Sequence, residues 1–377
     1  MDERIWLSSP HMGGNEQSYI NEAFDQNWIA PLGPNVSGFE SVLEEYLGED
    51  SHVACLSSGT GAIHLALVLA GVKRDDEVIC QTFTFCGSSN PIAYVGARPV
   101  FIDSELDTWN MCPVHLENAI IHRMENGKKP KAVILVHLYG MPAKIDEIQA
   151  VCKKYEIFLI EDAAEALGSK YKGRACGTFG DISILSFNGN KIITTSGGGA
   201  LVCRSREVKE KAIFLATQAR DNAPHYEHSE IGYNYRMSNI IAGIGRGQME
   251  VLDSHVSLRR SNNDFYQQIF NKVDKIKVLT EPSNQFYSNH WLSAILFNNN
   301  DLGENREKLR TFLQNLNIES RPLWKPMHLQ PIYKNELYFG NGGARDLFER
   351  GLCLPSGSNL TDNQKSRIQA ALTEWFN

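Results

Sequence analysis

Short apolar runs alternate with helical patterns between residues 50 and 215, and this alternation constrains the fold more than any other feature of the chain. The runs at 132–136 and 157–160 contain no polar residue, and residues 145–155 between them repeat apolar side chains at helical spacing. A strand that is covered on both faces reads as a continuous apolar run. The pattern therefore predicts a doubly wound α/β domain with a mostly parallel sheet. Its strands are expected at residues 52–56, 77–80, 99–102, 132–136, 157–160, 182–187 and 200–203.

The pattern of apolar and polar residues changes near residue 250, where polar segments begin to separate shorter apolar runs. We expect a large domain over residues 1–250, which includes an N-terminal segment, and a smaller C-terminal α+β domain over residues 251–377. A helix is expected at 239–252. Another is expected at the end of the chain, where Thr361 and Gln364 have the spacing of a capping box.

Net charge and cysteine usage argue against several classes of protein. The chain carries a net charge of -7 and 8 cysteines, none of them in a Cys-x-x-Cys pair. It lacks the basic excess of a general nucleic-acid binder, and its cysteines are typical of a reduced, cytoplasmic protein. No signal peptide is evident, and no apolar stretch is long enough to span a membrane. His225 and His228 alone are a weak metal pattern, so we expect no metal.

Lys191 is the strongest candidate for a reactive group. It lies just beyond the apolar run at 182–187, which contains Ser186, and it is followed by hydroxyl residues and the glycines at 197–199. A lysine amine that is kept from full hydration loses proton affinity and can form a Schiff base with a carbonyl. Chemistry with pyridoxal phosphate (PLP) needs such a lysine, a phosphate cradle and an acid that faces the pyridine nitrogen.

Two other segments are candidates for the cradle and the acid. Residues 57–62, which include Gly59 and Thr60, follow an apolar run and begin an expected helix, whose exposed N–H groups can bind phosphate. An ordinary capped turn is the alternative for these residues. Asp162 follows the run at 157–160, at the sheet edge where open α/β folds bind ligands. A helix N-cap is the alternative for Asp162.

Three more segments carry suitable aromatic or polar groups. Phe85 follows a strand and could stack on a flat cofactor ring, although a core aromatic is the simpler interpretation. Asn234 and Arg236 precede an expected helix and could bind a phosphate or a carboxylate. The loop at 321–328 mixes basic and aromatic groups that suit a diphosphate and a flat base, and equally suit a plain surface loop.

Taken in order, these segments resemble the DegT-type sugar aminotransferases, a branch of the fold-type I PLP enzymes. The match extends over nearly the whole chain, in the segments SSGTGAIHLAL, TFTF, EDAAEALGS, SFNGNKIITTSGGG, GYNYRMSN and PLWKPMHLQPIY. Residues 8–16, 29–33 and 217–220 look closer to one subgroup. That subgroup makes UDP-4-amino-4,6-dideoxy-N-acetylglucosamine, on the route to bacillosamine and bacterial surface glycans.

The resemblance implies a fold-type I PLP aminotransferase that forms a homodimer with shared active sites. It places PLP on Lys191, Asp162 against the pyridine nitrogen, and Glu165 near the phenolic oxygen, where the family commonly has Gln or His. The other implied contacts are to the cofactor phosphate (Gly59, Thr60 and Ser186), the cofactor ring (Phe85), the neighbouring subunit's phosphate (Asn234) and the substrate (Arg236, Arg321 and His328).

The reaction that the resemblance implies is a ping-pong transfer of the amino group of glutamate to C4 of a UDP-4-keto-6-deoxy-N-acetylhexosamine, with release of 2-oxoglutarate. A 3-keto or a GDP-linked 4-keto nucleotide sugar is the alternative substrate. A dinucleotide-dependent oxidoreductase is disfavoured because residues 57–62 lack Gly-x-Gly-x-x-Gly. A dehydratase of the same family would carry His at position 191. Two departures from the family pattern, Ile192 for Asn and Ser-Gly-Gly-Gly at 196–199 for Gly-Glu-Gly-Gly, leave Lys191 in place.

Overall fold

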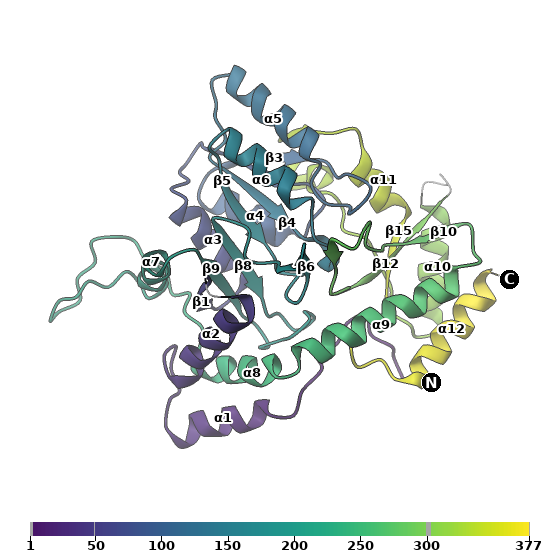
Figure 1. Ribbon diagram of the computed structural model, residues 1–377, viewed down its shortest axis with the longest axis horizontal. Helices are drawn as coiled ribbons and strands as arrows, with labels where there is room; N and C mark the ends of the chain where they lie inside the picture. The colour runs from purple at the N-terminus through teal and green to yellow at the C-terminus, as the bar shows by residue number, and fades with distance from the viewer. Residues whose placement is uncertain (1–2, 49, 299–302, 377) are drawn as a thin grey trace.

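A computed structural model describes residues 3–48, 50–298 and 303–376. An eight-stranded sheet in the order β1-β9-β8-β5-β4-β2-β3-β14 forms its centre (Figure 1). Strand β9 pairs antiparallel with β1 and β8, and the other pairings are parallel, so the expected mostly parallel sheet is confirmed. The strands are β1 (His52–Leu56), β2 (Glu77–Gln81), β3 (Arg98–Ile102), β4 (Ala132–Val136), β5 (Phe158–Asp162), β8 (Ile182–Ser186), β9 (Gly199–Cys203) and β14 (Leu337–Phe339).

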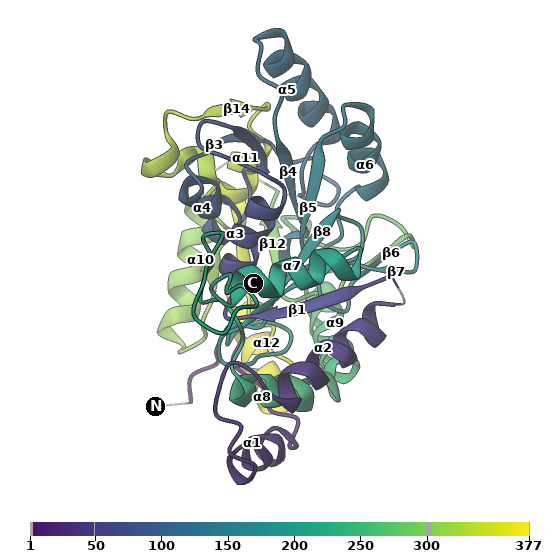
Figure 2. The same cartoon turned by 90° about the vertical axis from the view of Figure 1, so that its left-hand side faces the viewer.

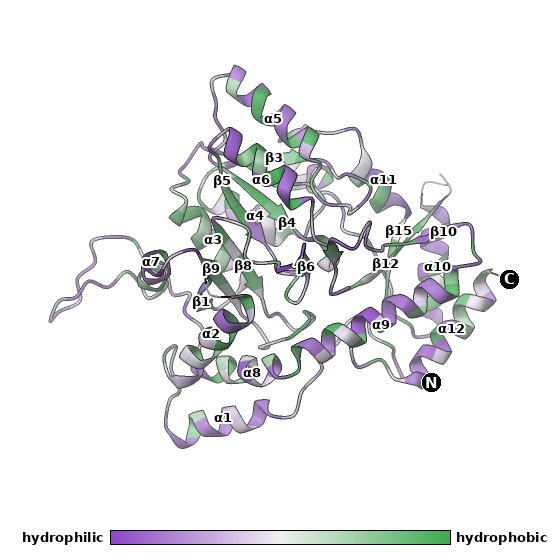
Figure 3. Cartoon of the chain, in the orientation of Figure 1, coloured by the Kyte–Doolittle hydropathy of each residue, from purple (hydrophilic) through white to green (hydrophobic). Residues whose placement is uncertain are grey.

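Helices cover both faces of this sheet, which is why its strands read as continuous apolar runs. Alternate residues of β4 enter different cores: Ile134 packs with α3 and α7, whereas Val133 and Leu135 pack with α5 and α6. Figure 2 shows α3 and α4 on one side of the strands and α6 on the other, and Figure 3 shows the hydrophobic residues gathered in the strands. The helices around this sheet are α2 (Pro34–Leu47), α3 (Gly59–Leu69), α4 (Cys86–Tyr94), α5 (Pro113–Glu125), α6 (Ile145–Lys154), α7 (Arg206–Ala216) and α8 (Asn239–Met249).

A smaller antiparallel sheet, β10-β12-β15-β13, forms a second core. The helix expected at 239–252 is α8, which ends at Met249, and the next helix, α9, begins at Leu252. The expected capping box at the start of α12 is present, since the backbone N–H groups of Thr361 and Gln364 each donate to the other's side chain, at 3.1 and 3.2 Å. These elements are α9 (Leu252–Phe270), β10 (Ile276–Val278), β12 (Ser293–Phe297), α10 (Glu304–Asn315), β13 (Arg321–Pro322), α11 (Gly343–Arg350), β15 (Gly351–Leu354) and α12 (Asp362–Phe376).

Two segments cross the expected boundary at residue 250. Strand β14 pairs with β3 in the large sheet, and buried Ile5 forms a parallel bridge with Ile318 beside the small sheet. The division into a large domain over 1–250 and a small domain over 251–377 therefore remains a prediction. It does not hold for β14 or for the segment around Ile5. None of the helices in the described ranges is both long and apolar enough to cross a membrane.

The end of β5 is held by one buried carboxylate. Glu161 accepts hydrogen bonds from His137 Nε2 at 2.8 Å, from Ser183 Oγ at 2.7 Å and from the N–H groups of Gly177, Phe179 and Gly180. Burial alone would raise the pKa of Glu161, but these hydrogen bonds outweigh it and lower the pKa to about 2. Strand β5 therefore continues through Glu161 and Asp162, two residues beyond the apolar run at 157–160.

Replacing Glu161 by Gln tests this network. We expect Glu161→Gln to lower the free energy of unfolding at pH 7 by about 2 to 5 kcal/mol, because an amide NH₂ would face N–H groups that need an acceptor. The wild type should also lose stability as the pH falls from 4.5 towards about 2, since the unfolded carboxyl takes up its proton first. Urea unfolding across that pH range measures both effects. The exposed Glu156→Gln is the control, and equal pH slopes in wild type and Glu161→Gln would contradict the assignment.

Candidate active site

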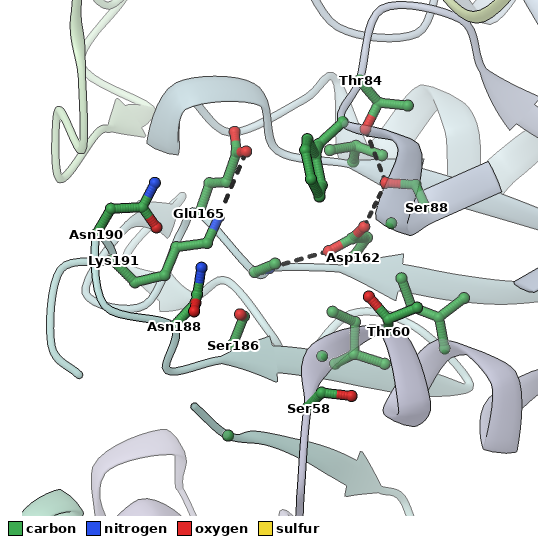
Figure 4. A pocket seen from close by; sticks show the side chains of 18 of the residues that line it. Ser58, Thr60, Thr84, Ser88, Asp162, Glu165, Ser186, Asn188, Asn190 and Lys191 are labelled. Carbon is green, nitrogen blue, oxygen red and sulfur yellow. Dashed lines mark hydrogen bonds and ion pairs between the residues drawn. The ribbon is translucent and has the colours of Figure 1, made fainter. Parts of the chain in front are cut away.

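A cavity of about 320 Å³ opens where β5 and β8 end and α3 and α4 begin (Figure 4). The carboxyl ends of parallel strands are where open α/β sheets bind ligands. Seven of the residues singled out in the sequence line this cavity: Gly59, Thr60, Phe85, Asp162, Glu165, Ser186 and Lys191.

The amine of Lys191 lies inside the cavity between an acid and an aromatic ring. Its Nζ is 3.5 Å from Glu165 Oε1 and 4.0 Å from the ring centroid of Trp291, and 11% of the side chain is exposed. Figure 4 shows the side chain reaching across the cavity towards Glu165.

Side chains from segments outside the large sheet bind the turn that carries Lys191. The carbonyl of Asn190 accepts hydrogen bonds from Ser8 Oγ at 2.7 Å and from Trp291 Nε1 at 2.6 Å. Arg259, which is buried, donates to the carbonyl of Trp291 at 2.6 Å. The N-terminal segment and the region after β11 (Phe286–Tyr287) therefore position the lysine together.

Asp162 is the last residue of β5 and lies buried at the cavity wall. Ser88 Oγ donates to its Oδ2 at 2.7 Å, and the N–H of Ala164 donates to its Oδ1 at 3.1 Å. Burial raises the pKa of Asp162, and these hydrogen bonds offset part of the rise. A turn follows Asp162 instead of a helix, so the N-cap interpretation is wrong.

Glu165 faces the amine from a second buried position. Its Oε2 accepts a hydrogen bond from the N–H of Tyr139 at 2.7 Å, which leaves Oε1 towards Lys191. Burial raises the pKa of Glu165, and the charge of Lys191 offsets part of the rise. With both acids ionised, Asp162, Glu165 and Lys191 leave one negative charge that a cationic ligand atom would balance.

The start of α3 presents a helix N-terminus to the cavity, opposite Ser186. The Oγ of Ser58 accepts from the N–H of Gly61 at 3.0 Å and caps the helix, while Gly59 and Thr60 line the cavity at its positive end. A Cβ on Gly59 would lie 3.0 Å from the Cβ of Ser186. Ser58 therefore acts as an ordinary helix cap, as the capped-turn interpretation says. Gly59 is needed because a side chain there would crowd Ser186 across the cavity.

Asn234 and Arg236 lie outside this cavity's lining. Asn234 is exposed and forms a bridge with Thr217, beside the long excursion that follows α7. The guanidinium of Arg236 is bound to the buried Glu40 and to the carbonyl of Cys55, the latter at 3.0 Å. Within this chain Arg236 therefore stabilises the contact between α2 and β1.

Arg321 and His328 lie farther along the C-terminal loop. Arg321 pairs with Glu319 at 2.7 Å and lines a second cavity that adjoins the first. The imidazole of His328 contacts Thr82 Oγ1 through Nδ1 at 2.7 Å and stacks on Tyr338 at 3.9 Å. Burial lowers the pKa of His328. His328 lines neither cavity, and here it fixes the loop against the end of β2.

A separate buried cluster brings His137, Glu161 and Cys176 together, with one potential metal-ligand atom of each within 4.8 Å of the others. The hydrogen bonds described above engage Glu161 and His137 Nε2. Burial raises the pKa of the Cys176 thiol well above its usual range, which disfavours the thiolate that binds metals. These contacts are those of a structural network.

Residues 10–373 match the DegT/DnrJ/EryC1/StrS aminotransferase family. The chain belongs to this family. It is 51% identical over 380 residues to EpsN of Bacillus subtilis (strain 168), covering 100% of this chain and 97% of EpsN. It is 39% identical over 372 residues to GDP-perosamine synthase of Escherichia coli O157:H7, covering 99% and 98% of the two chains.

The solved structures agree with the family. Spr1654 of Streptococcus pneumoniae, solved in PLP and PMP forms, superposes with a TM-score of 0.90 at 26% identity, over 99% of this chain and 98% of that one. The fold expectation is confirmed, and as in other DegT-type aminotransferases the cofactor is PLP. The cavity fits PLP, because it offers an anion site at α3, a buried acid for a ring nitrogen and an amine for an aldehyde.

The sequence patterns missed part of the DegT-type site. Trp291 and Trp324 both line the cavity, and Ser88 holds Asp162. Trp324 lies in the loop noted for its aromatic and basic groups, but nothing local to Trp291 marks it. Ser88 follows the Thr-Phe-Thr-Phe segment by three residues, and its role depends on the packing of α4 against the end of β5.

Replacing Asp162 by Asn tests the role of its negative charge, because the substitution removes the charge and keeps the size of the side chain. The amide can keep the hydrogen bond from Ala164, but it cannot hold a positive charge on a ring nitrogen. We expect the rate at which glutamate converts the bound PLP to fall by on the order of 10²- to 10³-fold. Stopped-flow absorbance of the cofactor band measures this rate. The exposed Asp181→Asn is the matched control, and an unchanged rate in Asp162→Asn would remove Asp162 from the chemistry.

Proposed function

We propose that this chain transfers the amino group of glutamate to C4 of a UDP-4-keto-6-deoxy-N-acetylhexosamine, giving UDP-4-amino-4,6-dideoxy-N-acetylglucosamine. The observation that carries the proposal is the buried amine of Lys191 between Glu165 and Trp291, close to Asp162, in a chain of an aminotransferase family. Similarity to GDP-perosamine synthase supports a nucleotide-linked sugar as the amino acceptor.

In this proposal the amine of Lys191 would hold the cofactor until the amine of glutamate takes its place, and the freed amine would then move a proton between the carbon of the amino acid and the cofactor. PLP, when bound, supplies the aldehyde and the electron-accepting ring. Asp162 keeps the ring nitrogen protonated, and Glu165 holds the amine of Lys191 near the reacting atoms. The cofactor phosphate is held by Gly59, Thr60 and Ser186.

Phe85 closes the cavity from the side of the ring. It is the residue before α4, it is 51% exposed, and its ring lies 5.5 Å from that of Trp324. A bound ring would cover this exposed aromatic surface and exclude water from it. The two half-reactions share this site in turn: glutamate enters and 2-oxoglutarate leaves, and then the keto sugar enters and the amino sugar leaves.

A homodimer with shared active sites is part of the proposal. The excursion after α7, over residues 217–233, extends away from the body of the chain (Figure 1). Tyr226 and Ile231 on it expose 79% and 84% of their surface. Exposed apolar side chains on a projecting segment favour a protein partner. Asn234 lies at the base of the excursion, from which it would reach the neighbouring subunit's cofactor phosphate.

A GDP-linked 4-keto sugar is the second candidate substrate. The 39% identity to GDP-perosamine synthase over nearly the whole chain favours it. A 3-keto nucleotide sugar, which carries its carbonyl at C3, is the remaining alternative.

A panel of keto sugars tests the substrate. We expect the PLP-loaded protein and glutamate to aminate the UDP-linked 4-keto-6-deoxy-N-acetyl sugar in preference to a UDP-linked 3-keto sugar and a GDP-linked 4-keto sugar. Mass spectrometry of the nucleotide products measures this preference. Lys191→Ala should lose on the order of 10³-fold or more in turnover. Preferred amination of the GDP-linked sugar would select the second candidate, and full activity in Lys191→Ala would remove the lysine from its role.

Mixing two inactive variants tests the shared site. Asn234→Asp should prevent cofactor binding at limiting PLP, because a carboxylate would face the phosphate. Lys191→Ala lacks the amine. In a mixed dimer one of the two sites combines an intact Lys191 with an intact Asn234, so co-expression should restore roughly one quarter of wild-type activity. No activity above that of the separate variants would place Asn234 outside the partner's site.

A further inference from the structure

Two further cavities continue from the one around Lys191. The second, of about 720 Å³, shares Asn190, Trp291 and Trp324 with the first. The third, of about 170 Å³, shares Glu319 and Arg321 with the second. The three cavities therefore lie next to one another along the segment around β13.

The third cavity is lined by an excess of positive charge. Its lining contains Arg4, Arg310 and Arg321 against one acid, Glu319. Arg321 pairs with Glu319, and Arg310 pairs within its own helix with Glu307. In the described part of the chain Arg4 has no carboxylate within ion-pair distance, and its guanidinium lies 4.5 Å above the ring of Trp6. Of these three arginines, Arg4 alone has no carboxylate partner among the described residues, so its charge is left for a ligand.

Backbone alternation turns Arg4 and Trp6 to the same side. Ile5 between them is fully buried and forms the bridge with Ile318. Successive side chains of an extended segment point to opposite faces, so Arg4 and Trp6 both point away from the core. Trp6 is 53% exposed and lines the second cavity, beside the arginines of the third.

Two buried polar atoms along the segment around β13 lack a hydrogen-bond partner among the described residues. They are Ser320 Oγ, in the lining of the third cavity, and Trp324 Nε1, in a residue that lines both other cavities. Unsatisfied buried polar atoms are rare, and a ligand is one reason for them. Both occur on the segment that joins the three cavities.

We propose that Arg4, Arg310 and Arg321 bind the diphosphate of the nucleotide sugar, with Trp6 against the nucleobase and the hexose in the second cavity next to Trp324. This inference rests on the proposed function. Guanidinium groups are well suited to phosphate oxygens, and a half-exposed indole is suited to a flat base. Residues 321 and 324 are at most about 11 Å apart along the chain, so one short segment contacts both the phosphates and the cavity of Lys191.

Binding of UDP to the PLP-loaded protein tests the subsite by isothermal titration calorimetry. We expect Arg310→Ala and Arg4→Ala each to raise the dissociation constant of UDP by about tenfold, and UMP to bind more weakly than UDP to the wild type. Lys308→Ala is the matched control. It removes a cation that pairs within the same helix with Glu304 and does not line the third cavity. Two separate arginine variants keep the test valid if one of them fails to fold.

The outcomes separate this inference from the proposed function. Absence of UDP binding by the wild type, or equal affinities in the wild type and both arginine variants, would overturn the diphosphate subsite. The absorbance of the bound cofactor on addition of glutamate reports the first half-reaction, which involves no nucleotide. Failure of that spectral change in the wild type would overturn the proposed function, whatever the affinity for UDP.

Discussion

The arrangement of the site depends on the buried carboxylate of Glu161 at the end of β5. Glu161 and Asp162 are consecutive residues of one strand, so their side chains lie on opposite faces. Glu161 accepts enough hydrogen bonds to lower its pKa to about 2, whereas burial outweighs the fewer hydrogen bonds of Asp162 and raises its pKa. The network on one face fixes the backbone, and the fixed backbone holds a carboxylate at the cavity wall on the other.

Charge explains why the cavity suits a cationic ring. Asp162 and Glu165 are both buried and both have raised pKa values because of burial, and Lys191 supplies one opposing charge. In the arrangement that we propose, a protonated ring nitrogen beside Asp162 would remove the remaining imbalance. The phosphate of the same ligand would bind at the start of α3 without a further side-chain charge. The three subsites are complementary to one molecule, so binding any part of it favours binding the rest.

Sequence patterns predicted what depends on local order. The apolar runs located every strand of the large sheet except β14, because these strands are largely buried, and the residues around Gly59, Asp162 and Lys191 come soon after strand ends. Contacts between distant segments left no local pattern. Trp291 lies 100 residues from Lys191, β14 joins the large sheet from the C-terminal region, and Arg236 is held by Glu40. The cavity contains the residues implied for the chain's own cofactor, which lie at the start of α3 or at and after the ends of β2, β5 and β8. It omits Asn234 and the residues implied for the substrate, which lie on other parts of the chain.

This difference also bears on how a DegT-type fold can serve several sugars. The groups around Lys191 are fixed by β5, β8 and the start of α3, which belong to the buried core, so changing them would disturb the sheet. The diphosphate subsite that we propose lies instead on the first residues of the chain, on one face of α10 and on the edge strand β13. Substitutions there alter no residue of the large sheet. Selection for a new nucleotide sugar can therefore act on Arg4, Trp6 and Arg310 while the chemistry at Lys191 stays the same.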